Sequence, residues 1–337
     1  MDRADALVER IKTLAGRTHG PAVLEGIGGF ASLFSLKPIL EAAGGMADPV
    51  LVAGTDGVGT KLKLAFRSGR HDTIGVDLVA MCLNDILTTG ATPLFFLDYF
   101  GTGKLDVGVA ESVIAGIAAA CKEGGLALVG GETAELPGLY APGEYDLAGF
   151  AVGVVDREKI IDGKSCAAGD VLLGVRSTGL HSNGFSLAQK ILFEHAGLTL
   201  DSELEDCGTV LEALMPPTAL YTKAVKALSP LGPKALAHIT GGGLPGNLPR
   251  VLPESLTPVV RKGWGVPSIF LHLQRLGNVE EAEMYRTFNM GIGLVVVLAP
   301  ENVAAAVRAL AAVDQNAVVI GELVPRTEPQ EDFRWAP

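Results

Sequence analysis

The chain has 337 residues, of which 48% are hydrophobic and 19% are charged, and its formal net charge is −11. This length favours two domains over one core, and the apolar content excludes a disordered chain. The acidic balance argues against nucleic acid or an anionic membrane as the main partner. The charged N-terminus predicts no signal peptide, and no apolar run reaches the roughly 18 residues of a membrane helix. We therefore expect a cytoplasmic protein.

The cysteines agree with that location. Cys82, Cys121, Cys166 and Cys207 are far apart in the sequence and form no Cys-x-x-Cys pair. This spacing favours free, buried thiols in a reducing compartment over disulfides or a metal site.

Strands and amphipathic helices alternate in the first half of the chain. The expected elements are a helix over 2–16, a glycine-rich loop over 26–30, an apolar run over 50–53, a helix over 74–89, a strand over 94–99, a helix over 106–123, and strands over 126–129 and 147–155. This alternation predicts an α/β or α+β domain with a mixed sheet.

A polar segment over 156–169 marks the expected domain boundary, which divides the chain into domains 1–160 and 161–337. The second half repeats the alternation of strands and helices. Its expected elements are a strand over 171–175, a helix from 184 to 196, a helix from 218, strands over 237–240 and 294–298, and a last helix followed by a final strand over 317–324.

The stretch Gly54–Lys61 places three glycines, one carboxylate and one lysine directly after an apolar run. Glycines let the backbone approach a ligand closely, and the acidic and basic side chains suit a nucleotide phosphate with its Mg²⁺. The stretch is not a P-loop, because the order Thr60-Lys61 reverses the usual Lys-Ser/Thr pair. A second glycine motif, Gly241–Gly246, is not a dinucleotide fingerprint, because Pro245 and Pro249 stand where its helix should begin.

Three carboxylates stand beside glycine-rich backbone, at turns after strands or at helix ends: Asp56, Asp85 and Glu132. Each alone is compatible with a helix cap or a surface charge, but the set suits oxygen ligation of Mg²⁺ that bridges phosphates. Asp85 and Asn84 lie on the expected helix 74–89, whose polar face we assign to Asp77, Met81, Asn84, Asp85 and Thr88.

Two histidines stand next to short glycine-rich segments in the second half. His181 precedes Ser182-Asn183-Gly184, and His238 precedes Thr240-Gly241-Gly242-Gly243. A lone histidine is usually structural, yet these neighbours favour a binding role. No Gly-x-Ser-x-Gly motif or other nucleophile arrangement is evident.

Together these motifs resemble a known enzyme family. Asp85 followed after four residues by Gly90-Ala91-Thr92-Pro93 resembles the signature of an ATP-using superfamily that includes selenophosphate synthetase, thiamine-monophosphate kinase and a hydrogenase-maturation protein. Further segments single out the phosphoribosylformylglycinamidine cyclo-ligase family within it: 71–81 (HDTIGVDLVAM), 95–99 (FFLDY), 130–135 (GGETAE), 181–184 (HSNG), 238–243 (HITGGG) and 283–289 (EMYRTFN). The resemblance extends from about Leu7 to Val324.

The resemblance implies a ligase of purine biosynthesis that closes an imidazole ring on formylglycinamidine ribonucleotide at the expense of ATP. It implies a homodimer whose N-terminal sheets form a shared barrel, with ATP near that interface, and a C-terminal α/β sandwich domain that completes the active site. It assigns catalytic roles to Lys12, Asp85 and His181, and Mg²⁺ ligation to Asp56, Asp85 and Glu132. The remaining nucleotide- or phosphate-binding candidates are Gly54, Thr55, Gly57, Gly59, Asn84, Asn183, His238, Gly241 and Gly242.

Two alternatives stay open from the sequence. Another superfamily enzyme is one, although selenophosphate synthetase needs a reactive residue near the N-terminus and the first cysteine here is Cys82. The other is a nucleotide-binding regulator without catalysis, against which the presence of Lys12, Asp56, Asp85 and His181 argues.

Overall fold

The computed structural model describes residues 3–28, 30–328 and 330–336. Asp2, at the start of the expected first helix, and Gly29, in the expected loop 26–30, lie outside the described residues. The chain divides into two compact units, Met1–Ile160 and Ile161–Pro337. In the described part of the chain, no helix is both long and apolar enough to cross a membrane.

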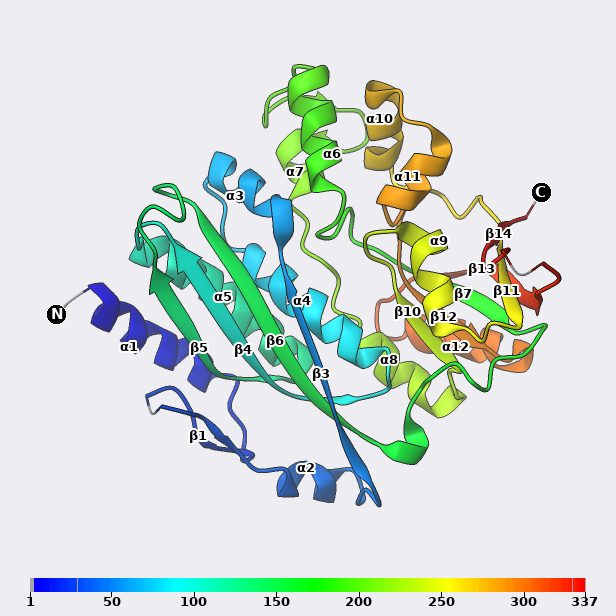
Figure 1. Ribbon diagram of the computed structural model, residues 1–337, viewed down its shortest axis with the longest axis horizontal. Helices are drawn as coiled ribbons and strands as arrows, with labels where there is room; N and C mark the ends of the chain where they lie inside the picture. Colours follow the sequence, from blue (N-terminus) through cyan, green and yellow to red (C-terminus); the bar gives the residue numbers. More distant parts are fainter. Residues whose placement is uncertain (1–2, 29, 329, 337) are drawn as a thin grey trace. The chain divides into compact units, whose positions relative to one another are not determined.

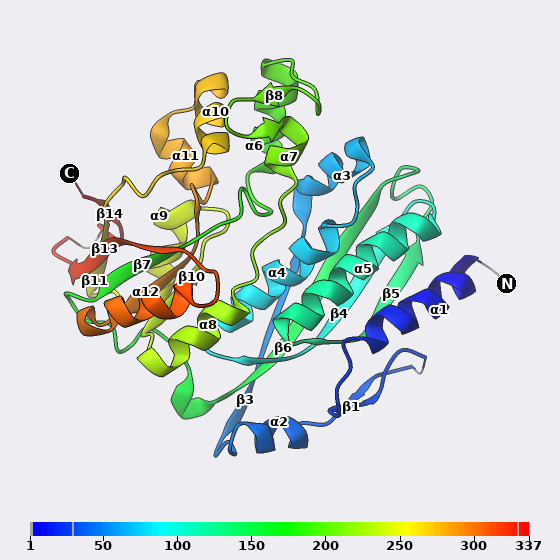
Figure 2. The same ribbon diagram turned by 180° about the vertical axis from the view of Figure 1, so that it is seen from behind.

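Unit 1 is built on a four-stranded mixed sheet with the order β3-β6-β4-β5, in which only β4 and β5 run parallel. Helices α4 and α5 cover one face of this sheet and α1 packs beside α5 (Figures 1 and 2). The elements are α1 (Arg3–Gly16), β1 (Val23–Glu25), β2 (Leu33–Phe34), α2 (Lys37–Ala42), β3 (Pro49–Gly57), α3 (Leu62–Ser68), α4 (Ile74–Leu87), β4 (Thr92–Thr102), α5 (Val107–Gly124), β5 (Ala127–Glu135) and β6 (Tyr145–Asp156).

Local signals explain how the two covering helices form and meet. The side chain of Asp106 caps α5 by accepting hydrogen bonds from the backbone N–H groups of Gly108 and Val109. Gly125, in the left-handed conformation, ends the helix. Helices α4 and α5 cross at Gly75, where an added Cβ would lie 2.1 Å from the backbone oxygen of Val113. The glycine therefore permits the close approach that seats α4 against both α5 and the sheet.

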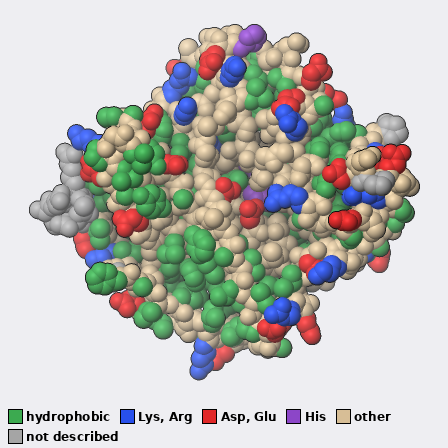
Figure 3. Space-filling model, in the orientation of Figure 1, with side chains coloured by type: hydrophobic (Ala, Val, Ile, Leu, Met, Phe, Trp, Pro, Cys, Tyr) green, Lys and Arg blue, Asp and Glu red, His purple; other side chains and the backbone are tan. Residues whose placement is uncertain are grey.

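The opposite, outer face of this sheet is only partly covered. At one end, Phe34, Leu36, Ile39 and Met46 pack on Leu94, Val152 and Val154. Farther along the strands, Leu51, Tyr99 and Phe150 are 60%, 40% and 40% exposed. Hydrophobic side chains gather over these strands on the face shown in Figure 3. A soluble monomer rarely leaves a large apolar patch open, so this face suggests a contact surface.

Unit 2 contains a six-stranded sheet with the order β10-β12-β7-β13-β11-β14, antiparallel except for the pair β11 and β14. Helices α8 and α12 pack against each other (Figure 2). The elements are β7 (Val171–Arg176), α6 (Phe185–Gln189), β8 (Glu203–Leu204), β9 (Gly208–Thr209), α7 (Val210–Leu214), α8 (Thr222–Leu228), β10 (Ala235–His238), α9 (Gly243–Asn247), β11 (Leu256–Val260), α10 (Ser268–Gly277), α11 (Glu281–Thr287), β12 (Ile292–Leu298), α12 (Val303–Ala311), β13 (Ala317–Pro325) and β14 (Arg334–Trp335).

The expectation of an α/β (α+β) chain with a mixed sheet is confirmed. Four local predictions need correction. The glycine-rich stretch after residue 53 is strand up to Gly57, and the segment that carries Glu132 is strand rather than turn. The helix expected from Thr218 begins at Thr222, and the strand 317–324 is followed by the short β14.

The predicted polar face of α4 is also wrong in part. Asp77, Met81 and Asn84 are buried, whereas Asp85 is exposed. Because α4 packs against α5 as well as against the sheet, contacts surround much of the helix and leave little of it facing water. The four cysteines are free thiols, as predicted, with Cys82 and Cys121 buried and the other two half-buried.

Candidate functional site

The edge strand β3 carries the first group of predicted residues. Gly54, Thr55, Asp56 and Gly57 pair in antiparallel register with residues of β6. An added Cβ on Gly54 would lie 3.9 Å from the Cβ of Asp85, an ordinary contact distance, so this part of β3 runs beside the end of α4 that carries Asp85. The hydroxyl of Thr55 donates to the backbone oxygen of Gly149 at 2.8 Å and is thereby used within the sheet.

Asp56 and Asp85 lie near the same buried thiol. Cys82 donates to the backbone oxygen of Asp56, with 3.8 Å between Sγ and the oxygen. Burial, together with the negative charges of Asp56 and Asp85, raises the pKa of Cys82 to about 12. The structure thus brings two of the three predicted Mg²⁺ ligands together, one from a strand and one from an exposed position on a helix.

Lys61 does not point toward this pair of carboxylates. Its Nζ lies 2.8 Å from Oδ2 of Asp77, and both side chains are completely buried. Burial lowers the pKa of Lys61 and the charge of Asp77 opposes that change. The lysine therefore fastens the turn after β3 to α4 and is not available as a surface phosphate contact. Gly59 begins this turn with φ +67°.

The opposite edge strand, β5, carries Glu132, which is exposed. Glycines precede it, and Gly131 has no room for a side chain because an added Cβ would lie 2.4 Å from Oδ1 of Asp98 on β4. Lys12 lies nearby on α1, where its Nζ pairs with Oε1 of Glu9 at 2.8 Å. The Lys12 side chain also borders the glycine-rich loop, since an added Cβ on Gly28 would lie 3.7 Å from its Cε.

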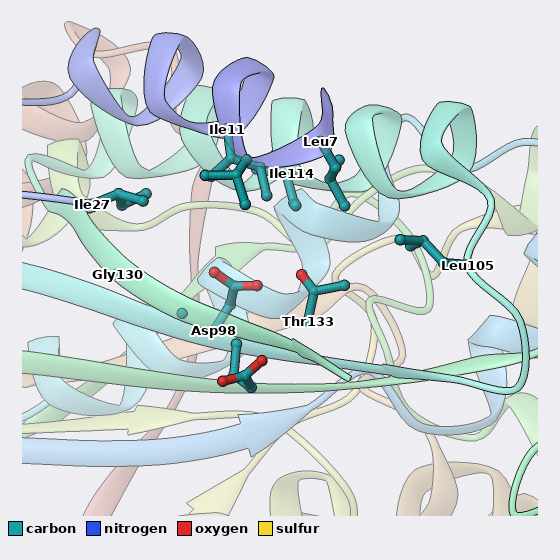
Figure 4. A pocket seen from close by; sticks show the side chains of 11 residues that line it. Leu7, Ile11, Ile27, Asp98, Leu105, Ile114, Gly130 and Thr133 are labelled. Carbon is teal, nitrogen blue, oxygen red and sulfur yellow. The ribbon is translucent and has the colours of Figure 1, made fainter. Parts of the chain in front are cut away.

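Two cavities adjoin this edge, and Asp98, Gly130, Gly131 and Glu132 line both. One, of about 190 Å³, lies between the helices α1 and α5 and the strands β4 and β5. Figure 4 shows Leu7, Ile11 and Ile114 above the strands that carry Asp98 and Thr133. The other, of about 550 Å³, is walled by the loop around Gly28 and by phenylalanines of β2 and β4.

Asp98 is the residue that sequence reasoning missed. Burial raises its pKa from 3.8 to about 7. Its charge acts on the buried Cys121 of α5, which places the carboxyl on the helix-covered side of the sheet. The available signal was the segment FFLDY, where one carboxylate interrupts an apolar strand.

The β3 and β5 groups stand at opposite edges of one sheet. Across the strands, Asp56 pairs with Gly149, Gly149 with Asp98, and Asp98 with Gly131, the neighbour of Glu132. Three strand spacings separate the edges by about 14 Å. Among the described residues, no three His, Cys, Asp or Glu side chains gather into a metal site. Within one chain, therefore, Glu132 and Asp56 do not meet.

In unit 2, His181 is buried in the left-handed conformation, with φ +61°. Its Nε2 accepts from the backbone N–H groups of Thr178 and Ala219 at 3.3 and 3.5 Å. A nitrogen that accepts these bonds carries no proton, so in this geometry the ring is neutral and organises the loop. Its ring also packs near that of Tyr221, with the centroids 6.3 Å apart.

The other predicted residues of unit 2 form a loop next to this histidine segment. Oδ1 of Asn183 accepts from the backbone N–H of Gly241 at 3.1 Å. His238 ends β10 and is buried. Gly242 and Gly243 have φ +96° and +60°, and an added Cβ on Gly243 would lie 1.8 Å from the backbone oxygen of Tyr285. The structure thus brings Asn183 and Gly241 into direct contact.

Comparison with known sequences identifies the family. Residues 42–155 match the family model described as AIR synthase related protein, N-terminal domain, and residues 167–332 match the corresponding C-terminal domain. A phosphoribosylformylglycinamidine cyclo-ligase from Sorangium cellulosum is 58% identical over 96% of this chain and 93% of its own. The chain belongs to the phosphoribosylformylglycinamidine cyclo-ligase family.

Other cyclo-ligases are similarly related. The enzyme from Anaeromyxobacter sp. is 56% identical over 96% of this chain and 93% of its own, and that from Thermoanaerobacter pseudethanolicus is 53% identical over 96% and 95%. The cyclo-ligase family consists of ligases, so these relatives indicate that the chain is an enzyme of that class.

Solved structures extend the fold beyond the cyclo-ligases. Thiamine-monophosphate kinase from Stenotrophomonas maltophilia K279a aligns with a TM-score of 0.69 at 19% identity, covering 98% of this chain and 95% of the kinase. The hydrogenase maturation protein HypE in complex with ATP aligns with a TM-score of 0.67 at 18% identity, covering 97% and 91%. At these identities the likeness concerns the fold alone.

Proposed function

We propose that this chain catalyses the ATP-dependent cyclisation of formylglycinamidine ribonucleotide to 5-aminoimidazole ribonucleotide, with release of ADP and phosphate. The observation that carries the proposal is the 58% identity to a cyclo-ligase over nearly the full length of both chains. The grouping of Asp56 with Asp85 adds a physical reason, because paired carboxylates are suitable ligands for the Mg²⁺ of a nucleotide.

The chemistry asks the protein mainly to position reactants and to neutralise charge. ATP supplies a phosphoryl group that converts the formyl oxygen of the substrate into a good leaving group. The ring-forming nitrogen then attacks the activated carbon and phosphate departs. Asp56 and Asp85 would hold Mg²⁺, while Lys12, as an exposed cation beside Gly28, would meet a phosphate group. Asn84 is buried, so it would support the neighbouring Asp85 and would not contact the nucleotide itself.

We also propose that the working form is a homodimer in which the acidic site is shared. Glu132 stands about 14 Å from Asp56 by strand spacing, a separation that one Mg²⁺ with ligands at about 2 Å does not bridge. Edge strands β3 and β5 border the apolar outer face that bears Leu51 and Phe150. If a second sheet packs on this face, the β5 edge of one copy comes to lie beside the β3 edge of the other.

The unit 2 loop is suited to hold a phosphate of the substrate. Gly241 and Gly242 add no side chain of their own to this loop, and the imidazole of His238 stands at the end of the preceding strand. His181 would shape this loop through the two backbone hydrogen bonds that it accepts, and Asn183 would fix the position of Gly241.

The test is a turnover assay with purified protein, ATP, Mg²⁺ and formylglycinamidine ribonucleotide. We expect a diazotisable aminoimidazole product and ADP in equal amounts. Folded protein that forms neither product would contradict the proposed activity, and ADP formation without the imidazole would point to a different acceptor for the phosphoryl group.

A further inference from the structure

Asn247 is a buried polar residue at the end of α9 to which the proposed function gives no role. The residue is 3% exposed. Its Nδ2 donates to the backbone oxygens of Thr240, Gly241 and Gly243 at 3.4, 3.2 and 2.9 Å. All three oxygens belong to the glycine loop, Thr240–Gly243, which leads into α9. One side-chain amide therefore holds the loop in its conformation, because releasing it would leave buried polar groups without partners.

Arg250 determines which end of this amide faces the loop. It lies one turn after Asn247, and its guanidinium donates to Oδ1 of Asn247 at 3.0 Å. A guanidinium has donors and no acceptor, so the atom that it meets is the amide oxygen. The NH₂ group of Asn247 is thereby directed at the carbonyl oxygens of the glycine loop.

Gly241, in the middle of this loop, is held from two sides. Oδ1 of Asn183 accepts a hydrogen bond from its N–H at 3.1 Å, while Asn247 donates to its oxygen. The next two residues, Gly242 and Gly243, have φ +96° and +60°, a region that glycine adopts without strain. Two side-chain amides and two glycines thus give the loop its shape.

This arrangement decides which polar groups the loop offers to a ligand. In a trans peptide the C=O and the following N–H point in opposite directions. Because the oxygen of Gly241 is turned toward Asn247, the N–H of Gly242 points away from Asn247. In the described ranges of the chain, this N–H meets no hydrogen-bond acceptor, and Gly242 is half-buried. A backbone N–H without an acceptor, with the neighbouring carbonyls turned away, suits an anion.

We propose that Asn247 is a positioning residue for the substrate: it draws the carbonyl oxygens of the glycine loop to itself and so directs the N–H of Gly242 at the phosphate of formylglycinamidine ribonucleotide. The inference rests on the proposed function and adds the residue that orients the loop. Asn247 is buried and acts through the backbone, so it should affect substrate binding and leave the chemical step unchanged.

The experiment compares the steady-state kinetics of the unmodified protein and Asn247→Asp. Aspartate keeps the size of the side chain and the acceptor for Arg250, but its carboxylate repels the carbonyl oxygens that the amide held. We expect KM for formylglycinamidine ribonucleotide to rise by about tenfold or more, as lost hydrogen bonds in a binding loop imply. kcat and KM for ATP should stay within about twofold of the unmodified values.

Asn302→Asp is the matched control. The amide of Asn302 also donates to a backbone oxygen in unit 2, that of Leu231 at 2.9 Å, but far along the chain from the glycine loop. This variant should leave KM for both substrates and kcat unchanged. If Asn247→Asp does not fold, Asn247→Ser, whose hydroxyl can donate to one carbonyl at a time, should raise KM for formylglycinamidine ribonucleotide by about threefold.

Two results overturn the proposal. One is an unchanged KM for formylglycinamidine ribonucleotide. The other is a similar loss in kcat or in KM for ATP, which would make Asn247 a residue that only stabilises unit 2. Titration calorimetry with formylglycinamidine ribonucleotide separates this proposal from the proposed function. Unmodified protein that binds this ligand without turnover refutes the activity alone, and Asn247→Asp should still bind it about tenfold more weakly. Unmodified protein that does not bind it refutes both.

Discussion

The two edges of the unit 1 sheet differ in what they offer a ligand. The β3 edge presents charge: Asp56 and Asp85 converge there, and the buried pair of Lys61 and Asp77 anchors the turn behind them. The β5 edge offers cavities: its glycines and Glu132 border two cavities with largely apolar walls. Neither edge alone combines a metal site with a pocket for a base. This difference supports the proposal that each edge supplies half of a nucleotide site.

The anchoring of the β3 edge should show the largest effect on stability. Lys61→Met leaves Asp77 buried without its cation, and we expect a loss of about 3–5 kcal/mol in the free energy of unfolding. Urea denaturation measures this loss. The double variant Lys61→Met/Asp77→Leu should recover most of it, because no charge is then left buried.

An exposed pair provides the control for that experiment. Lys164→Met breaks the contact of Lys164 with Asp162, where the lysine is 86% exposed, and should change stability by less than about 0.5 kcal/mol. Equal losses for Lys61→Met and Lys164→Met would refute the anchoring role of the buried pair.

The next largest effect should be on catalysis. Asp85→Asn is expected to lower kcat by roughly 10²–10³-fold, because a carboxylate aligned with Mg²⁺ and developing charge is lost. Since Asp85 is exposed, the melting temperature should stay close to that of the unmodified protein. Asp72→Asn, at an exposed carboxylate just before the same helix, is the control. A variant that melts early but turns over normally would make Asp85 a structural residue.

At the β5 edge, the raised pKa of Asp98 should make the free energy of unfolding depend on pH. The pKa of Asp98 is raised from 3.8 to about 7, so the folded state holds a proton that the unfolded state releases. Its contribution therefore weakens stability as pH rises from about 4 to 7. We compare the free energy of unfolding of Asp98→Asn with that of the unmodified protein at two pH values. The difference in favour of the variant should be about 2 kcal/mol larger at pH 8 than at pH 5.

The titratable neighbours of Asp98 also affect how stability changes with pH. Among the described residues, the charge of this carboxyl acts on Cys121 and Glu132 lines its cavity, and both residues remain in the variant. Asp146→Asn, an exposed change on β6, should shift stability equally at both pH values. The same lack of pH dependence in Asp98→Asn would show that Asp98 titrates normally.

The α/β (α+β) fold and several local features could be predicted from the sequence, because they depend on signals that lie close together along the chain. Asp106 and the glycine that ends α5 are local signals, so the helix could be placed to within a residue. The pairing of Gly54–Gly57 with β6 is a contact between distant segments, which spacing along the chain does not reveal. The burial of Lys61 depends on tertiary packing in the same way. From the sequence alone, a lysine beside glycines suggests a phosphate ligand, because its buried surroundings are not visible there.

The candidate site shows the same limit. The carboxylates Asp56 and Asp85 could be named as candidates from the sequence, because Asp56 stands among glycines and Asp85 stands near the end of an expected helix. Their separation from Glu132 could not, because it follows from the strand order β3-β6-β4-β5. The role of Asp98 as a cavity-lining residue could not be predicted from the sequence for a similar reason, since the packing of α1 over the sheet encloses that cavity.

The sharing of one site between the two sheet edges is tested most directly by complementation. Asp56→Asn and Glu132→Gln are each expected to be inactive, and the two chains can be coexpressed with different tags and purified as the mixed dimer. If Asp56 of one copy works with Glu132 of the other, one of the two sites in that dimer is intact, and kcat per dimer should be about half that of the unmodified protein. A mixed dimer as inactive as its parents would contradict the shared site and place all of its carboxylates within one chain.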